Sequence, residues 1–408
     1  TRQGRLPDGV KRKRGGQPGH VGHHRPLFEV SDDRIVRVPC EKECDCSGTI
    51  EPKGEPYRLQ QVEIPEIQLE ITEYQLETGI CGKCKKVHRA ALPEGVAPGL
   101  LGPTVLAFIA VMVGGYQLSR RSVQAVLLAL MGLRVSASTV SQAEEHISQA
   151  LARHYEEGRG GVQKAGTANF DETGSRREGK RSWIWLAASA SITVFLVSAS
   201  RGSKAFTQLL GGLFSGIMTS DRWHTYNSYA TKLRQLCFAH LLRDFQKIAD
   251  RGGASKCLGE ALIAATLQMF EVWGKFKDEA LTREELREHM LPIREAVEKL
   301  LEEGTRLAKA PKTVETCRNI LKLKAALWTF VDHEGVEPTN NRAERLIRNA
   351  VLWRKRSLGT WSERGDRYLE RLLTVMVSLR LQNRPALPWL TAAIRAHYRQ
   401  GPHPSLLP

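Results

Sequence analysis

The arrangement of apolar and polar residues predicts different structures along the chain. Over residues 58–76 the two classes alternate, which is typical of half-buried strands. The apolar members of that pattern are Val62, Ile64, Ile67, Leu69 and Ile71. Residues 100–160 follow a helical pattern instead, and serines at 119 and 136 are suited to cap the starts of two helices.

The stretch from residue 166 to residue 250 predicts a mixed sheet. Three strand-like runs are followed by a helix, a fourth run, and a short last strand that leads into a helix. Their expected bounds are 166–171, 182–189, 192–199, 204–213, 216–221, 234–238 and 240–250. This order matches an α/β core of the ribonuclease-H-like kind.

Helical patterns dominate the rest of the chain. Residues 255–330 are charged and helix-patterned, so they are expected to form an insertion within the catalytic domain. A helix at 339–350 has one apolar face, and Glu344 lies at the edge of that face. Thr339 or Asn340 is suited to cap its start. Residues 366–400 supply further helix.

Three carboxylates stand where a two-metal nuclease would need them. Asp171 and Asp221 each close a strand-like run, and Glu344 lies in the first turns of a helix. Two strand-end carboxylates and one on a helix can converge to hold two Mg²⁺ or Mn²⁺ ions. Glu172 is left out of this set, because neighbours on a strand point to opposite faces.

The cysteines fall into two groups. Cys81-x₂-Cys84 is one half of a four-cysteine zinc site, and the other half lies among Cys40, Cys44 and Cys46. His88 is a reserve ligand. We therefore expect one structural Zn²⁺, held by four of the five clustered cysteines. The remaining cysteines are expected to be buried free thiols, and they are Cys237, Cys257 and Cys317.

The charge of the chain favours an anionic polymer as partner. The 408 residues carry a net charge of +16, and the basic residues cluster at 1–26 and 342–371. Nucleic acid is the commonest partner of such a surface. No apolar run reaches the roughly 18–20 residues of a membrane span. With no visible signal peptide, we expect a cytoplasmic protein, and its basic charge favours association with nucleic acid rather than with a membrane.

Several stretches resemble, in order, blocks of the insertion-sequence-66 family of bacterial transposases. They include GGQPGHVGHHRP, DETGSRREGKRSWIWL, SDRWHTYNSYA, CFAHLLRDF and NNRAERLIRNAVLWRKRSLGTWSERG, and the cysteine pairs also fit. The resemblance runs from about Lys11 to about Pro388. It implies a D-D-E transposase with Asp171, Asp221 and Glu344 as the triad. It also aligns Cys46 with one zinc ligand and leaves its partner open between Cys44 and Cys40.

The resemblance also implies an organisation. We expect a basic Gly/Pro-rich arm at 1–26, a zinc-ribbon-like module at 27–95 and a helical region at 96–160. That region resembles a helix-turn-helix for DNA binding or dimerisation, although an apolar first helix favours a packing scaffold. A ribonuclease-H-like catalytic domain is expected at 161–400, with the helical insertion at about 251–335.

The expected partner is double-stranded DNA, both transposon ends and target. A homodimer or larger assembly on DNA is expected, and accessory proteins of the same element are suggested by the family. His240 and Arg243 are equally in keeping with a structural role. The predicted DNA contacts are Lys11, Arg12, Lys13, Arg14, Arg25, His240, Arg243, Asn341, Arg348, Arg354, Lys355 and Arg356.

Two other functions fit the same residues. One is a DNA-binding regulatory protein that keeps the fold but no longer cuts. The other is a structure-specific nuclease of the ribonuclease-H-like kind, which lacks strand transfer. Metal-dependent cleavage of the element's own end DNA, and joining of the product, separate the three.

Overall fold

The computed structural model describes the chain except for residues 1–25, 52, 213 and 400. The chain divides into two compact units, Thr1–Gln68 and Leu69–Pro408. In the described part of the first unit, η1 (Asp32–Arg34) is a short 3-10 helix. The side chain of Gln60 accepts from the backbone of Phe28 and donates back to it, both at 2.8 Å.

The strands predicted within residues 58–76 do not form, so that prediction was wrong. Val62, Ile64 and Ile71 are 67%, 78% and 86% exposed, and the segment has no regular secondary structure. An alternating segment becomes a strand only where a neighbouring strand takes its backbone hydrogen bonds and a core covers its apolar face. The described residues provide neither for this segment.

The second unit begins with a hairpin and three helices. Strand β1 (Thr78–Ile80) pairs antiparallel with β2 (Val87–Arg89). Helices α1 (Pro103–Gly114), α2 (Arg120–Met131) and α3 (Ala137–Gln163) follow. Ser119 and Ser136 cap α2 and α3 by accepting from Ser122 N and Thr139 N, so both predicted caps are confirmed.

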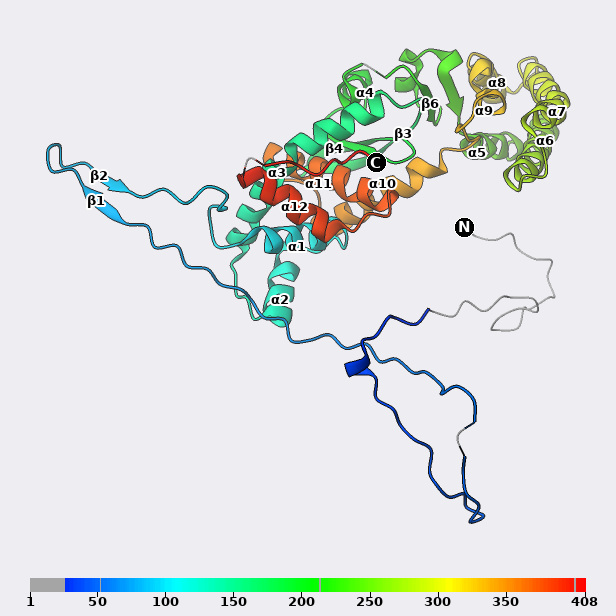
Figure 1. The fold of residues 1–408 in the computed structure, drawn as a ribbon. Helices are drawn as coiled ribbons and strands as arrows, with labels where there is room; N and C mark the ends of the chain where they lie inside the picture. The colour runs from blue at the N-terminus through cyan, green and yellow to red at the C-terminus, as the bar shows by residue number, and fades with distance from the viewer. Residues whose placement is uncertain (1–25, 52, 213, 400) are drawn as a thin grey trace. The chain divides into compact units, whose positions relative to one another are not determined.

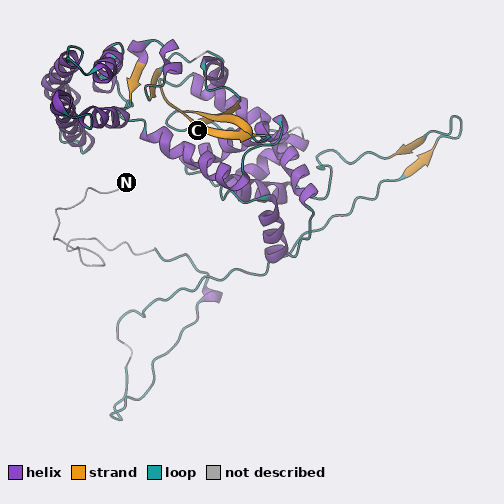
Figure 2. Ribbon diagram, turned by 180° about the vertical axis from the view of Figure 1, so that it is seen from behind, coloured by secondary structure: helices purple, strands orange, loops and turns teal. Residues whose placement is uncertain are grey.

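A five-stranded mixed sheet forms the centre of this unit (Figure 2). Its strands lie in the order β5-β4-β3-β6-β7. Strands β3, β4 and β5 are antiparallel, whereas β6 and β7 run parallel to β3, so the predicted mixed α/β class is confirmed. The strands are β3 (Thr167–Arg177), β4 (Lys180–Ala188), β5 (Thr193–Ser198), β6 (Ile217–Ser220) and β7 (Arg234–Leu236).

Helices cover both faces of the sheet because its inner strands are apolar on both. On β4, Trp185 and Ala187 pack into a core shared with α1 and α3, while Ile184 and Leu186 pack into a core on the other face. That second core is completed by α10 (Asn341–Ser357) and α11 (Glu363–Leu381). Helices α4 (Ser203–Leu210) and α12 (Ala386–Arg399) join the first core.

A helical group lies beyond β7, at one end of the sheet (Figure 1). It has its own apolar core and includes most of the segment predicted to be helical at 255–330. Its helices are α5 (Phe238–Ala249), α6 (Gly253–Lys277), α7 (Arg283–Gly304), α8 (Pro311–Leu321) and α9 (Thr329–Asp332). Among the described residues, no helix has the length and apolar character needed to cross a membrane.

Candidate functional site

The sheet register brings Asp171 and Asp221 side by side. Asn169 on β3 pairs with Thr219 on β6 in a parallel ladder. Each aspartate lies two residues beyond that pair, so both lie at the same end of the β3–β6 ladder. The prediction that Asp171 ends its strand was wrong, because β3 continues to Arg177 by pairing with β4 alone. Asp221 directly follows β6, as predicted.

Asn340 fixes the start of the helix that carries Glu344. Its side-chain amide donates to Phe170 O on β3 at 2.7 Å and accepts from Asn169 Nδ2 at 2.9 Å. Of the two predicted caps, Thr339 and Asn340, the second takes the N-cap position, but its side chain makes no cap bond to the helix. Its two bonds instead hold the first turn of α10, with Glu344, next to β3.

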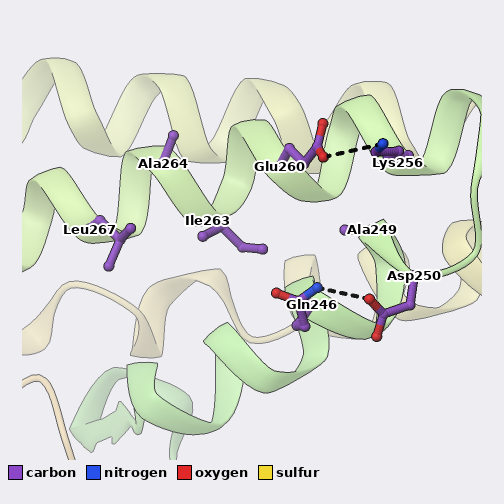
Figure 3. Close-up of a pocket in the computed structure, with 8 residues that line it drawn as sticks. All are labelled: Gln246, Ala249, Asp250, Lys256, Glu260, Ile263, Ala264 and Leu267. Carbon is purple, nitrogen blue, oxygen red and sulfur yellow. Dashed lines mark hydrogen bonds and ion pairs between the residues drawn. The ribbon is translucent and has the colours of Figure 1, made fainter. Parts of the chain in front are cut away.

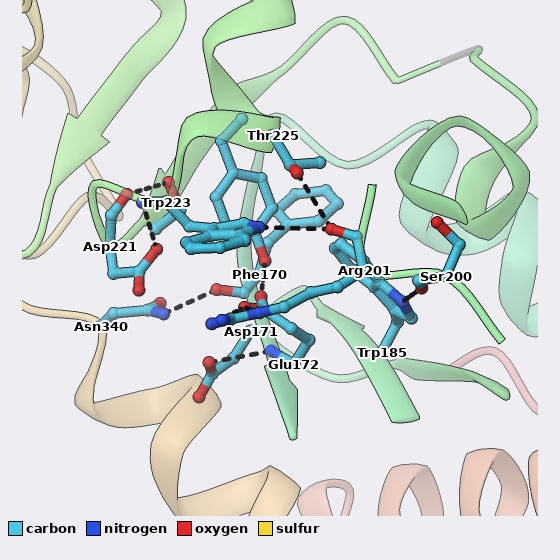
Figure 4. A network of polar contacts seen from close by, with 12 residues as sticks. Phe170, Asp171, Glu172, Trp185, Ser200, Arg201, Asp221, Trp223, Thr225 and Asn340 are labelled. Carbon is cyan, nitrogen blue, oxygen red and sulfur yellow. Dashed lines mark hydrogen bonds and ion pairs between the residues drawn. The ribbon is translucent and has the colours of Figure 1, made fainter. Parts of the chain in front are cut away.

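Burial and neighbouring carboxylates raise the pKa of Asp171 to about 8. Burial is the largest cause, and the charges of Glu172, Asp221 and Glu344 add to it. Asp221 Oδ1 accepts from Trp223 N at 2.8 Å, which holds that carboxylate at the end of β6. Figure 4 shows the aspartates near Asn340. The site thus concentrates negative charge with little compensation at Asp171.

Glu172, on the other face of β3, has hydrogen-bond partners, although burial still raises its pKa. It accepts from Arg201 Nε at 2.9 Å and from Tyr226 Oη at 2.5 Å (Figure 4). The Arg201 guanidinium lies 3.7 Å from the ring centroid of Trp223 and 4.6 Å from that of Trp183. Residue spacing alone did not predict this network. The sequence indicated only that Glu172 points to the face opposite Asp171, and the structure confirms this.

The carboxylate of Glu344 lies near basic side chains of α5. Among the described residues it forms no ion pair with Arg348, one turn further along its own helix. Its Oε1 lies 3.6 Å from His240 Nδ1 and 3.6 Å from Arg243 Nη2.

Cys237 lies at the start of α5. The prediction of buried thiols is confirmed for Cys237 and Cys317 but was wrong for Cys257, which is exposed on α6. In the described part of the chain, Cys237, His240 and Glu344 have ligand atoms that all lie within 4.8 Å of one another.

The other predicted DNA contacts are divided between paired and open positions. Arg354 donates to Thr173 Oγ1 at 3.4 Å, and Arg356 donates to Tyr116 O at 2.9 Å. The predicted contacts that are exposed along α10 are Asn341, Arg348, Lys355 and Arg356. The predicted contacts Lys11, Arg12, Lys13, Arg14 and Arg25 lie outside the described residues.

Two short loops present the clustered cysteines. In the first unit, a bridge between Glu43 and Thr49 closes a turn that contains Cys44 and Cys46 but not Cys40. The backbone N–H of Cys46 lowers the pKa of Cys44.

In the second unit, Cys81 N donates to Lys86 O at 2.9 Å, and Lys85 N donates to Cys81 O at 2.9 Å. These bonds turn the chain at the tip of the β1–β2 hairpin. The backbone N–H of Cys84 lowers the pKa of Cys81. Each loop therefore aims backbone donors at a sulfur, which favours the thiolate that binds metal.

A pocket of about 530 Å³ lies between α5 and α6 (Figure 3). Gln246 and Asp250 on α5 form a hydrogen bond at its edge, and Lys256 and Glu260 on α6 form an ion pair. None of the three candidate carboxylates lines it. The pocket is therefore separate from the carboxylate site.

Comparison with known proteins relates the chain to one family. The family described as "Transposase IS66 family" matches residues 98–368. The chain is 26% identical over 426 residues to "Uncharacterized protein y4qI" of Sinorhizobium fredii (strain NBRC 101917 / NGR234), covering 94% of this chain and 76% of the relative. It is 23% identical over 398 residues to "Uncharacterized protein y4hP" of the same strain, covering 89% and 71%.

Proposed function

The chain belongs to the IS66 family of transposases, and from this premise we propose that it cleaves insertion-sequence ends and joins each freed 3′-OH to target DNA. One observation carries the proposal. Asp171, Asp221 and Glu344 come from two strands and a distant helix, yet they lie close enough for the other two to raise the pKa of Asp171. A stable fold gathers like charges in this way mainly where a cation is bound.

The sheet supports a ribonuclease-H-like core. Three antiparallel strands are followed by two that run parallel to the first, in the order β5-β4-β3-β6-β7. We propose the catalytic domain at 161–400, with the helices of about 251–335 inserted before the strand-to-helix return at Glu344. The regions at 1–26, 27–95 and 96–160 are proposed as the basic arm, the zinc-ribbon-like module and the helical DNA-binding or dimerising region.

The residues of the site fit hard divalent cations. Carboxylate oxygens are the ligands that Mg²⁺ and Mn²⁺ prefer, and Glu344 Oε1 is a buried atom without a hydrogen-bond partner. Asp171, Asp221 and Glu344 would hold such ions through their carboxylate oxygens. When bound, the ions supply activation of water or of a 3′-OH and stabilisation of the leaving oxygen.

The chain's own residues hold and orient the reactants. Asn340 keeps α10 against β3, so that Glu344 faces the aspartates. Arg348 and Lys355 are exposed on the same helix and are proposed to contact phosphates of the DNA backbone. The basic arm adds further phosphate contacts. Assembly as a dimer or larger complex on DNA, with accessory proteins of the element, belongs to the same proposal.

We propose that the cysteine loops form a second metal site, which is structural. Cys81 and Cys84 supply two thiolates of one Zn²⁺ site. Cys44 is the better partner for Cys46, because the two share one closed turn and Cys40 lies outside it. A closed four-thiolate site stabilises a small module and takes no part in catalysis.

The test uses purified protein with DNA carrying the element's ends. With Mg²⁺ present, nicked ends and joined products are expected, and both should disappear when the cation is chelated. Binding without cleavage would identify a silent regulatory protein. Cleavage without joining would identify a structure-specific nuclease.

A further inference from the structure

Cys237, His240 and Glu344 form a cluster that the carboxylate chemistry does not use in full. Their Sγ, ring nitrogen and carboxylate oxygen all lie within 4.8 Å of one another. Cys237 is the residue before α5, and His240 lies in its first turn, so the x₂ spacing places both on the same side of the helix start. Glu344 reaches them from the first turns of α10.

The cluster is held in place by the backbone around it. Asn340 N donates to Cys237 Sγ at 3.1 Å, and Phe238 N donates to Pro338 O at 2.9 Å. The first turns of α5 and α10 therefore meet at the sulfur. Burial raises the pKa of Cys237, whereas the Asn340 N–H and the two helix N-termini, which favour negative charge, act against that rise.

Two atoms of the cluster have unused hydrogen-bonding capacity. His240 Nδ1 and Glu344 Oε1 are both buried atoms without a hydrogen-bond partner, although they lie 3.6 Å apart. A buried polar atom without a partner is unfavourable. Both can be satisfied together, with the sulfur, by a cation that accepts nitrogen, oxygen and sulfur ligands.

We propose that Cys237, His240 and Glu344 form a binding site for a thiophilic divalent cation of the Zn²⁺ type. Thiolate and imidazole ligands favour Zn²⁺ and disfavour Mg²⁺, so this site selects a different ion from the carboxylates. As the sulfur–metal bond forms, the thiol proton passes to solvent. Water completes the fourth position of a three-ligand site.

Glu344 is shared by this site and by the carboxylate site. A thiophilic ion bound to Cys237 and His240 also occupies the Glu344 carboxylate, which is then not available to bind Mg²⁺ together with Asp171 and Asp221. Zn²⁺ is thus expected to inhibit Mg²⁺-dependent cleavage. This second part of the inference depends on the proposed function, whereas metal binding to the cluster does not.

Cobalt binding tests the site without reference to catalysis. The full-length reduced protein is first given about one equivalent of Zn²⁺, to fill the closed four-thiolate site, and is then titrated with Co²⁺. A thiolate ligand gives Co²⁺ a charge-transfer band in the near ultraviolet. The wild type is expected to bind one more Co²⁺ with this band than the Cys237→Ser variant does.

Two further variants make the result decisive. His240→Gln leaves the Cys237–Asn340 bond intact and is expected to lose the same Co²⁺. Cys257→Ser removes an exposed thiol on α6 and is expected to bind as the wild type does. Circular dichroism and thermal melting of each variant show whether it is folded. If folded Cys237→Ser and His240→Gln both keep the wild-type spectrum and stoichiometry, the site does not exist.

A second readout tests competition for Glu344. Cleavage in Mg²⁺ is measured with and without added Zn²⁺, and the ratio is compared between the wild type and each variant. The expected inhibition is strong in the wild type and in Cys257→Ser, and weak in Cys237→Ser. If Zn²⁺ binds the cluster but does not inhibit cleavage, Glu344 is not shared by the two sites. A protein that never cleaves contradicts the proposed function, while the cobalt titration still decides the site.

Discussion

The carboxylate edge of the sheet and the two cysteine loops are both proposed metal sites, yet they are built in opposite ways. Asp171, Asp221 and Glu344 are positioned by long-range contacts, such as the bond between Asn340 and β3. The cysteine loops are positioned only by bonds between residues close in sequence, and most of their thiols are exposed. The first site is therefore formed by the folded core, whereas the proposed zinc site is expected to depend on its metal for order.

The largest expected effect follows loss of a carboxylate from the core site. Glu344→Gln should reduce cleavage by more than the ~10–100-fold that loss of an outer partner of a metal ligand causes. DNA affinity should change little, because Lys and Arg make the phosphate contacts. Kinetics on end DNA and a binding titration measure both.

Glu337→Gln is the matched control for this variant. Glu337 is an ion-paired glutamate whose side chain has the same exposed fraction as that of Glu344, 40%. Its replacement should leave cleavage unchanged. Normal cleavage by Glu344→Gln would remove Glu344 from the triad.

The cysteine loops should respond to metal loss where the core does not. After a mild chelator has removed loosely held ions, elemental analysis should find about one Zn²⁺ per chain. Cys84→Ser should lose it and become sensitive to protease within 27–95. Cys257→Ser should keep its zinc.

In both variants the sheet should melt at an unchanged temperature, because it is held by side-chain packing. A fully folded, metal-free module at 27–95 would contradict the expected dependence of the cysteine loops on metal. So would melting of the whole second unit on chelation.

A buried carboxylate outside the metal site provides a third test. Burial raises the pKa of Glu370 on α11 to about 7, and its carboxylate accepts from Val197 N at 2.8 Å. The folded protein thus holds a proton that the unfolded chain releases above about pH 4.5. Stability should fall as pH rises from about 4.5 to 7 and stay lower above that, by at most about 3 kcal/mol at ~1.4 kcal/mol per pKa unit.

Glu370→Gln should remove this part of the pH dependence, as measured by urea unfolding at several pH values. Asp366 nearby raises the pKa further, while Arg371 and Arg367 lower it. The variant should bind Mg²⁺ as the wild type does, since no cluster of carboxylates surrounds it. Identical pH profiles for the two proteins would show that the pKa of Glu370 is the same in the folded and unfolded states.

The smallest expected effect comes from the residue that joins α10 to β3. Asn340→Ala removes two hydrogen bonds but no candidate ligand, so cleavage should fall about tenfold, the lower limit for an outer partner of a metal site. The apparent Mg²⁺ requirement should rise. Asn319→Ala removes a side-chain hydrogen bond within α8, outside the site, and should do neither. A loss as large as that of Glu344→Gln would mean that Asn340 acts in the reaction itself.

The sequence predicted those parts of the fold where local pattern and tertiary packing agree. The strands β4 and β5 and the caps Ser119 and Ser136 depend on short-range periodicity and side-chain chemistry, and all were confirmed. The alternation at 58–76 failed because period alone does not supply a partner strand. The continuation of β3 past Asp171 was missed because it depends on β4.

The site itself could be predicted only in part. The nearness of Asp171 and Asp221 follows from strand order, which the sequence indicated. Two other features depend on contacts between distant segments. One is the contact of Glu344 with His240, and the other is the packing of Arg201 against two tryptophans. No local pattern encodes such contacts. Cys237 was recognised as a buried thiol, but its place beside Glu344 was visible only in the structure.

The helical group between β7 and α10 also sets the timing of synthesis. About 120 residues separate Asp221 from Glu344, so a ribosome that adds about 5–20 residues per second needs roughly 6–25 s to pass from one to the other. Throughout that interval the nascent chain holds both aspartates but not the glutamate. Under the proposed assignment, the protein therefore acquires the power to cut DNA only after Glu344 has been synthesised and α10 has packed against the sheet.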